Sequence, residues 1–175
     1  MISKLDHLIV AVNDLDEAQS NYKKIFGIDP VWHGEHEELG TANVIFNFKN
    51  TYFELLSSKG SGLGADLVNT SISMNGEGLI GLVLGTEDID VTKKLLMDKG
   101  FSVTEPSEGI GKSSKNNEIR KWKNIFLPQE LTRGIFSFII QHTHGNLNEI
   151  NKYEEASINK LDHVVINTND ADGFI

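Results

Sequence analysis

Two polar residues stand in runs that otherwise read as apolar strands, and either could do chemistry. His7 lies within Leu5–Val12, and Glu54 lies within Tyr52–Leu56. A bare carboxylate is costly to bury unless a cation faces it. Glu54 therefore predicts a metal ion, a protonated histidine or an arginine opposite it, or else an orientation toward solvent. His7 either belongs to such a site or hydrogen-bonds locally with Asp6 and fixes the strand.

Other polar side chains could line the same site. His36 precedes Gly40 closely enough to reach a cavity from a strand edge, or it remains on the surface. Asn43 could hydrogen-bond a ligand or merely close a turn. His142 and His144 have the spacing of a metal-binding pair on a strand, although a strand end that enters a loop is usually exposed to solvent.

An internal repeat indicates how these residues are positioned. The segments Ile2–Gln19 and Ile158–Ile175 share eight identities in 18 ungapped positions, His7 and His163 among them. A weaker copy, Leu79–Asp90, keeps the apolar strand and the Asp-x-Asp that follows it. Each copy predicts the same start of a folding unit, which is a strand, a short turn and a capped helix.

The first helix carries clear signals at both ends. Asp14 is expected to cap its N-terminus, with Glu17 completing a capping-box-like pair, and Gly27 to end it. Its apolar stripe is Leu15, Ala18, Tyr22, Ile25 and Phe26. A second helix is expected from Asp88 to about Lys99, with the thinner stripe Val91, Leu95 and Leu96.

Three strands are expected after each helix, which gives two βαβββ units and an α+β fold. Those of the first unit are Val31–His36, Ala42–Phe48 and Tyr52–Ser57, and those of the second are Ser102–Glu105, Lys121–Leu127 and Gly134–His142. The glycine-rich stretch Ser58–Gly78 predicts a flexible connector. The glycines of Gly109–Gly111 predict a flexible loop or a lid over the cavity, and the basic residues between Lys112 and Lys123 predict a solvated loop.

These elements predict one domain over residues 1–143, with units of about 1–58 and 79–143. Residues 144–157 are expected to form a linker that contains a short helix over 147–153, and residues 158–175 to begin a third, truncated unit. That unit leaves Phe174 and Ile175 uncovered, so we expect a longer natural protein. Alternatively, its strand Leu161–Thr168 docks on an exposed sheet edge.

Composition narrows the functional classes. The chain has a formal net charge of −9 and no cysteine. The negative charge opposes nucleic-acid binding, and the missing thiols exclude disulfides and thiolate metal sites and favour a cytoplasmic protein. The longest apolar runs, such as Leu8–Val12, are too short to cross a membrane. A small-molecule ligand and a homodimer formed through open sheet edges are the expected partners.

The motifs also carry a family resemblance. The opening L-D-H-L-I-V-A-V, the N-D-L-D that leads a helix to F-G-I, and H-x-x-x-G-T-A-N followed by Y-F-E-L-L resemble the vicinal-oxygen-chelate superfamily, in a glyoxalase-like branch. Glyoxalase I, extradiol dioxygenases, epimerases and bleomycin-resistance proteins belong to this group. The resemblance implies paired βαβββ units whose mixed sheets curl around a half-open cavity.

The same resemblance implies a metal site. Its ligands come from the first and fourth strands of a unit, which here are His7 and Glu54, and they suit one divalent ion such as Zn, Ni, Mn or Fe. Such an ion would leave positions open for a substrate with two adjacent oxygens. In the second unit, Gly81 replaces the histidine. Matching Phe53 to Phe136 or Phe138 puts Ser137 and Gln141, with no carboxylate, on the concave face and turns His142 away.

Three functions follow from this site. The first is a metal-dependent lyase, isomerase or dioxygenase that uses His7 and Glu54, with His36, Asn43, Ser137 and Gln141 lining the cavity. The second is a non-catalytic binder of the resistance type, favoured by the missing ligands of the second unit. The third is a degenerate unit of a longer enzyme whose working site uses His163. The substrate class is a small molecule in each case.

Overall fold

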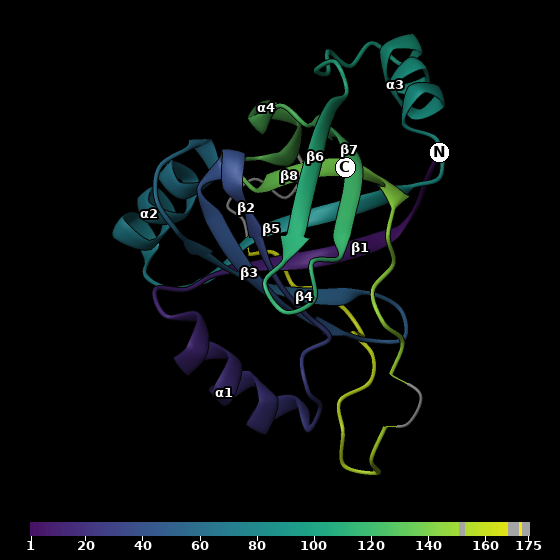
Figure 1. Ribbon diagram of the computed structural model, residues 1–175. Coiled ribbons are helices and arrows are strands. Elements are labelled where there is room, and N and C mark those ends of the chain that lie inside the picture. Colours follow the sequence, from purple (N-terminus) through teal and green to yellow (C-terminus); the bar gives the residue numbers. More distant parts are fainter. Residues whose placement is uncertain (151–152, 168–171, 173–175) are drawn as a thin grey trace.

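The computed structural model describes residues 1–150, 153–167 and 172. The first unit is built from β1 (Ile2–Ala11), α1 (Leu15–Phe26), β2 (Trp32–His36), the 3-10 turn η1 (Glu37–Leu39), β3 (Thr41–Asn47) and β4 (Tyr52–Ser58). The second is built from β5 (Gly78–Thr86), α3 (Ile89–Asp98), β6 (Ser107–Ser113), β7 (Ile119–Phe126), α4 (Gln129–Thr132) and β8 (Phe136–His144). Between the units lies α2 (Leu63–Asn75). The two βαβββ units and the α+β class are confirmed (Figure 1).

The two sheets curl until they meet and form one closed barrel. Its strand order is β1-β4-β3-β2-β6-β7-β8-β5. In each unit the first strand runs parallel to the last, β1 beside β4 and β5 beside β8, while β1 and β5 join the units as an antiparallel pair. The other seam is short, because β2 and β6 pair only through Gly34 with Ser113 and Glu35 with Lys112.

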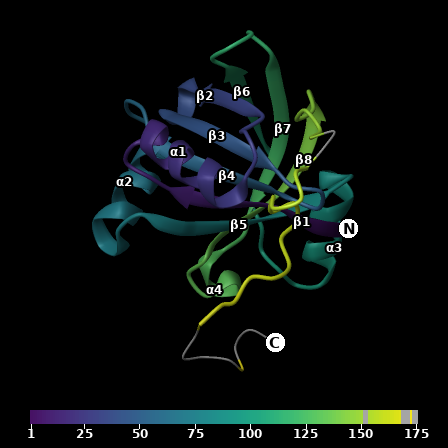
Figure 2. The same cartoon turned by 90° about the horizontal axis from the view of Figure 1, so that it is seen from below.

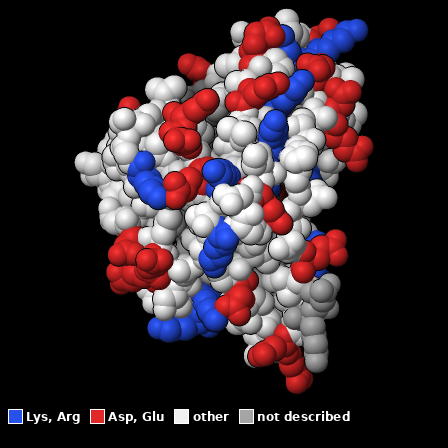
Figure 3. All heavy atoms as spheres, viewed as in Figure 1, with Lys and Arg blue, Asp and Glu red and all other residues white. Residues whose placement is uncertain are grey.

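The helices lie outside the barrel. In both views α1 and α2 cover the side of the first unit, and α3 lies on the far side (Figures 1 and 2). On the face seen in Figure 3, lysines and arginines are scattered among acidic side chains rather than gathered into one basic surface. No helix within the described residues is long and apolar enough to span a membrane.

Local sequence signals account for α1. The Asp14 carboxylate accepts hydrogen bonds from the backbone N–H groups of Asp16 and Glu17, at 2.8 and 3.0 Å. Gly27 ends the helix in the left-handed region with φ 66°. The buried stripe packs on a core of Val10, Val12, Phe26, Ile28, Val44, Phe46, Phe48 and Leu55. One predicted member of the stripe was wrong, because Ile25 is 59% exposed.

The region between the units is a helix and not a flexible connector. In α2, Ala65 and Val68 are buried, and Val68 packs with β1 residues Ile9 and Ala11. The glycine and serine content concealed this helix, because the few apolar residues that it buries are small. The stripe predicted for α3 was wrong for two of its three members, Val91 and Leu95, and correct for Leu96. Ile89, Thr92 and Leu96 face the core, whereas Val91 and Leu95 are exposed.

The strand predicted at Ser102–Glu105 was wrong, because β6 begins only at Ser107. Gly109 and Gly111 belong to this strand and not to a loop, and much of the predicted basic loop is β6 and β7. A Cβ on Gly109 would lie 2.2 Å from Nε1 of Trp122 on β7. The glycine is therefore needed because the indole lies across the strand, and not because the backbone must be flexible.

The chain after β8 runs back along the first unit. The backbone N–H of Lys49 donates to the carbonyl of Asn159 at 2.9 Å, and the Asn50 side chain bonds to the backbone of Leu161. Among the described residues from 158 to 167 no strand is assigned, and the described part of 147–153 has no helix. The remainder of the predicted strand at residue 168, with Phe174 and Ile175, lies outside the described residues.

Candidate functional site

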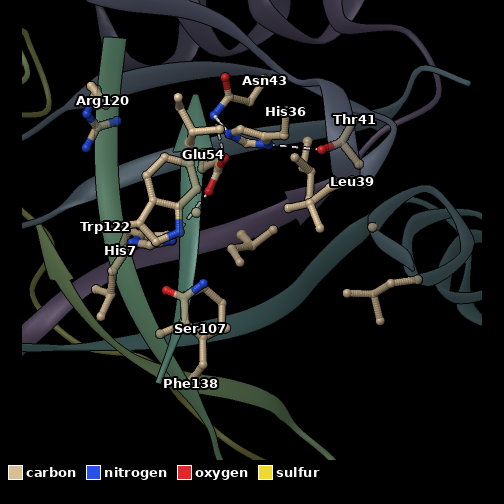
Figure 4. Close-up of a pocket in the computed structure, with 18 of the residues that line it drawn as sticks. His7, His36, Leu39, Thr41, Asn43, Glu54, Ser107, Arg120, Trp122 and Phe138 are labelled. Carbon is tan, nitrogen blue, oxygen red and sulfur yellow. Dashed lines mark hydrogen bonds and ion pairs between the residues drawn. The ribbon is translucent and has the colours of Figure 1, made fainter. Parts of the chain in front are cut away.

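The barrel encloses a cavity of about 590 Å³. Because alternate side chains of a strand share a face, β1, β3, β4, β7 and β8 each contribute every second residue of a stretch to its lining. One end is polar and is formed by His7, His36, Asn43, Glu54, Arg120 and His142. The remainder is largely apolar and includes Ile9, Leu63, Leu67, Ile110, Trp122, Phe126, Phe136, Phe138 and Ile140. Figure 4 shows the labelled polar side chains converging from β1, β2, β3, β4 and β7.

His7 and Glu54 face one another in this cavity. The two come from neighbouring parallel strands, with Ile9 of β1 opposite Glu54 in the register. The Nε2 atom of His7 lies 3.4 Å from Oε2 of Glu54, and both side chains are buried. The His7 ring stacks on Tyr52 with centroids 4.3 Å apart and meets the edge of Phe138. The adjacent strands and the shared hollow expected for this pair are both present.

Asp6 supports His7 from behind. Its Oδ1 accepts a hydrogen bond from Nδ1 of His7 at 2.9 Å and another from Nε2 of His142 at 3.0 Å. Burial disfavours the carboxylate of Asp6, yet these hydrogen bonds and the charges of the two rings hold its pKa well below the usual value. Burial likewise disfavours an imidazolium at His7, but hydrogen bonds to Asp6 and Glu54 and their negative charges raise its pKa.

Glu54 is held on its other side by Asn43. The amide Nδ2 of Asn43 donates to Oε1 of Glu54 at 2.6 Å. Burial alone would raise the pKa of Glu54, but the hydrogen bond and charge of His7, the charge of His36 and the amide of Asn43 lower it to about 2. The carboxylate is therefore ionised at neutral pH, and it faces His7, whose raised pKa favours the protonated histidine that was one of the predicted alternatives.

His36 presents a ring nitrogen to the same end of the cavity. Its Nδ1 lies 2.9 Å from Oγ1 of Thr41, and its Nε2 lies 3.5 Å from the amide Nδ2 of Asn43. An amide N–H beside Nε2 favours a lone pair there, with the ring proton on Nδ1. Burial lowers the pKa of His36. The negative charge of Glu54 opposes this shift, and the positive charges of Arg120 and His7 add to it. The lowered pKa favours the neutral ring of His36, whereas the raised pKa of His7 favours its protonated ring.

The donor atoms of His7 and Glu54 have the spacing of metal ligands. Two atoms about 2.1 Å from one ion at the tetrahedral angle lie about 3.4 Å apart, which is the separation of Nε2 and Oε2. The hydrogen bond from Nδ1 of His7 to Asp6 is the outer-shell contact that fixes a metal-binding imidazole. Within the described residues no group of three or more such side chains is assembled. The described residues therefore bring together two candidate ligands, and a metal ion held by His7 and Glu54 stays a prediction.

The second unit presents a different lining from the one expected. The parallel pairs set Ile9 against Glu54 in one unit and Val83 against Phe138 in the other, so Phe138 stands where Glu54 stands. The sequence alignment matched Phe53 to Phe136 or Phe138, whereas in the structure Glu54 corresponds to Phe138. This error of one residue assigned each β8 side chain to the wrong face of the strand. Ser137 and Gln141 accordingly lie outside the cavity lining, whereas His142, which was expected to turn away, points into it.

Gln141 has a structural role on the outer side of β8. Its side-chain oxygen accepts from the backbone N–H of Ile89 at 3.1 Å, and its amide donates to the carbonyl of Glu87 at 2.7 Å. These contacts hold the start of α3 against the strand. Ser137 is buried, and its backbone carbonyl accepts from the N–H of Leu127.

Arg120 and Trp122 were missed as site residues. Arg120, Trp122, Asn124 and Phe126 all line the cavity from β7, whereas Lys121 between them is exposed. The sequence did contain a signal for these residues, because every second residue of the strand faces the cavity. Interpreting this region as a solvated basic loop hid that alternation. The cavity residues of α2, Leu63 and Leu67, lie in the supposed connector and had no period-two signal to reveal them.

His163 lies apart from this site. Its ring is 70% exposed and contacts Asp162 at 2.7 Å, which repeats the Asp6–His7 pair in the open. It does not contribute to the cavity lining. A working site that uses His163 remains a prediction.

Comparisons with known proteins agree with this architecture. The glyoxalase-like domain family matches residues 5–174. The mitochondrial methylmalonyl-CoA epimerase of Dictyostelium discoideum is 30% identical over 117 residues, which are 65% of this chain and 68% of the epimerase.

Solved structures extend the similarity to the fold. A methylmalonyl-CoA epimerase from Streptomyces coelicolor, in complex with 2-nitronate-propionyl-CoA, aligns with TM-score 0.62 and 23% identity over 81% of this chain and 95% of that chain. A hypothetical protein from Staphylococcus aureus gives TM-score 0.66 and 21% identity over 81% of this chain and 60% of that one. The chain belongs to the glyoxalase-like domain family of the vicinal-oxygen-chelate superfamily and is homologous to methylmalonyl-CoA epimerase.

Proposed function

We propose that this protein is an isomerase that binds a small carbonyl compound in the barrel cavity and moves a proton at the carbon next to the carbonyl. The observation that carries the proposal is the buried contact between His7 and Glu54 at the polar end of that cavity. The 30% identity to an epimerase supports the reaction class. Acyl thioesters related to methylmalonyl-CoA are accordingly the first substrates to test.

We further propose that His7 and Glu54 hold one divalent ion, of which Zn, Ni, Mn and Fe suit an imidazole and a carboxylate. When bound, such an ion supplies Lewis-acid stabilisation of negative charge on substrate oxygens. Asp6 keeps a proton of His7 on Nδ1, so that Nε2, once it has lost its own proton to admit the ion, would be the ligand atom. Asn43 holds the Glu54 carboxylate in position.

His36 is the proposed base. Its Nε2 lies at the same end of the cavity as Glu54, linked to it through Asn43. The carbon–hydrogen bond of the substrate breaks, its proton moves to Nε2 of His36, and its electron pair moves toward the carbonyl oxygen. Return of a proton to the carbon completes the reaction. The neutral ring at physiological pH suits this role, because a base must be unprotonated to act.

Deuterium exchange tests the reaction. The protein is incubated with methylmalonyl-CoA in D2O, with and without added Mn²⁺ or Zn²⁺, and NMR follows loss of the hydrogen at the carbon beside the thioester. We expect exchange faster than in the protein-free control. If a panel of such thioesters exchanges no faster with the protein than without it, the isomerase proposal is wrong.

Metal titration tests the ligands separately. Calorimetry of the wild type should show one divalent ion per chain, and Glu54→Gln should weaken its binding at least about 10-fold. Glu35→Gln is the matched control, because Glu35 is 43% exposed, is paired with Lys59 and lies outside the cavity lining. Equal affinities for the two variants would refute the site.

One observation favours a second candidate, a non-catalytic binder. The second unit has Gly81 and Phe138 at the positions where the first unit has His7 and Glu54. A half-site of this kind can hold a ligand without acting on it. Thermal-shift screening separates the two, since a binder would be stabilised by its ligand equally well in the presence of a chelator.

A further inference from the structure

Arg120 is a buried cation that the rest of the protein leaves incompletely satisfied. Its side chain projects inward from β7, and the residue is 6% exposed. The guanidinium carbon lies 5.5 Å from the ring centre of Trp32 and 5.6 Å from that of Tyr52. Its Nε–H has no hydrogen-bond partner, and within the described residues no carboxylate forms an ion pair with it.

The carboxylates nearest to the cavity are already engaged elsewhere. Glu54 faces His7 and Asn43, and Asp6 faces His7 and His142. Burying an arginine without a counter-charge is unfavourable. Buried arginines are therefore paired with an acidic residue of the protein or bind an anionic ligand. The aromatic rings hold the guanidinium in place but supply no negative charge.

The unsatisfied atoms gather in this one cavity. Five buried side-chain atoms in the described residues have no partner, and four of them, on Asn43, Arg120, Asn124 and His142, belong to residues that line it. Polar atoms are rarely left without partners in a protein interior. Those of Asn43, Arg120 and His142 lie at the polar end of the cavity, and they indicate a ligand that carries its own polar groups to that end.

The apolar remainder of the cavity lining defines the other end of that ligand. Ile110, Phe126, Phe136 and Phe138 provide an apolar surface, and Leu63 and Leu67 of α2 extend it. Only an apolar chain or ring can contact these side chains without losing hydrogen bonds to water. The two ends together require an amphipathic molecule of small size.

We propose that Arg120 binds a free carboxylate of the ligand, and that the substrates of this protein carry this carboxylate and an apolar portion in addition to the reacting carbonyl group. The planar guanidinium offers parallel N–H donors that match the two oxygens of a carboxylate. This assignment deepens the proposed function, since it places the charged end of the substrate beside His36 and Glu54. The anion site itself requires neither a metal nor a reaction.

The sequence provides a direct spectroscopic test. The chain contains only two arginines, Arg120 and Arg133. Protein labelled with ¹⁵N-arginine therefore gives two Nε–H signals. Titration with hexanoate should shift the Arg120 signal saturably and leave that of Arg133 in place. The matched neutral ligand, hexanamide, should bind about 10- to 100-fold more weakly, as expected for loss of a charged hydrogen-bond acceptor.

Variants complete the test. Arg120→Gln should bind hexanoate and hexanamide equally, whereas Arg133→Gln should keep the preference for the acid. Titrations in chelator exclude a metal-bound carboxylate and separate this test from that of the isomerase. Equal affinity of the wild type for the two ligands, an unmoved Arg120 signal, or no saturable hexanoate binding would overturn the assignment. The wild-type titration decides even if Arg120→Gln does not fold.

Discussion

His7 and His142 contact the same carboxylate oxygen, Oδ1 of Asp6, at 2.9 and 3.0 Å. One ring comes from β1 and the other from β8, at opposite ends of the two-unit domain. The shared oxygen ties the tautomer of His7 to a residue of the second unit. The second unit thus contributes to the polar end of the cavity, although its own half-site has lost the imidazole and carboxylate.

Replacing Asp6 with Asn should weaken metal binding about 10- to 100-fold, because the outer-shell carboxylate no longer fixes Nδ1–H of His7. Calorimetric titration with Zn²⁺ measures the loss. Asp162→Asn is the matched control, since Asp162 makes the same contact with His163 on an exposed segment. Unchanged affinity in Asp6→Asn would refute the role of Asp6.

His36→Gln should slow deuterium exchange of the thioester about 100- to 10,000-fold, the usual effect of removing a general base. Metal affinity should stay close to that of the wild type, because His36 is not a proposed ligand. His33→Gln serves as the control, since His33 lies on the same strand but bonds to Gln19 outside the cavity lining. Equal slowing in both variants would contradict a catalytic role.

The metal-free protein should lose stability in acid through Glu54. Its pKa is lowered from 4.5 to about 2 on folding, so its contribution is complete above pH 4.5 and disappears as the pH falls toward 2. The contribution is on the order of 3 kcal/mol of unfolding free energy.

Urea unfolding in chelator, at pH values from 6 to 3, measures this dependence. Glu54→Gln should be less stable than the wild type at pH 6 and should change less between pH 5 and 3. Glu35→Gln should follow the wild type. A Glu54→Gln curve parallel to that of the wild type would show that the carboxylate is not held by His7 as described.

Gly109→Ala should displace Trp122 from the cavity wall, since the added Cβ would lie 2.2 Å from the indole Nε1. We expect a loss of about 1–3 kcal/mol in unfolding free energy, as for other overpacked sites. Tryptophan fluorescence should shift with it, because Trp122 also contacts the ring of His36. Lys112→Ala on the same strand is the control, and an unchanged spectrum in Gly109→Ala would count against the packing described.

The first unit was predictable because its signals are local. Asp14 and Gly27 mark the ends of α1, and the His7 and Glu54 strands pair as their apolar runs indicated. In the second unit, β6 is rich in glycine and polar residues, and only the barrel makes it a strand. The register of β8 depends on its pairing with β5, which no local pattern specifies.

Arg120 shows why the burial of a strand residue could not be predicted from the sequence. Its neighbours on β7, Ile119 and Lys121, are exposed, and a single arginine among lysines reads as part of a solvated surface. Its burial follows from the position of β7 between β6 and β8. Sequence alone shows the alternation of the strand but not which of its faces the barrel will enclose.

Closure of the barrel changes how two copies of this chain could associate. Each of its eight strands has a hydrogen-bonded neighbour on both sides. The described part of the chain therefore has no free sheet edge to which a second copy could add a strand. A homodimer formed through open sheet edges, as the sequence predicted, is therefore no longer supported by the fold. Self-assembly would have to proceed through helices and loops on the outside, and strand-mediated aggregation would first require the short contact between β2 and β6 to come apart.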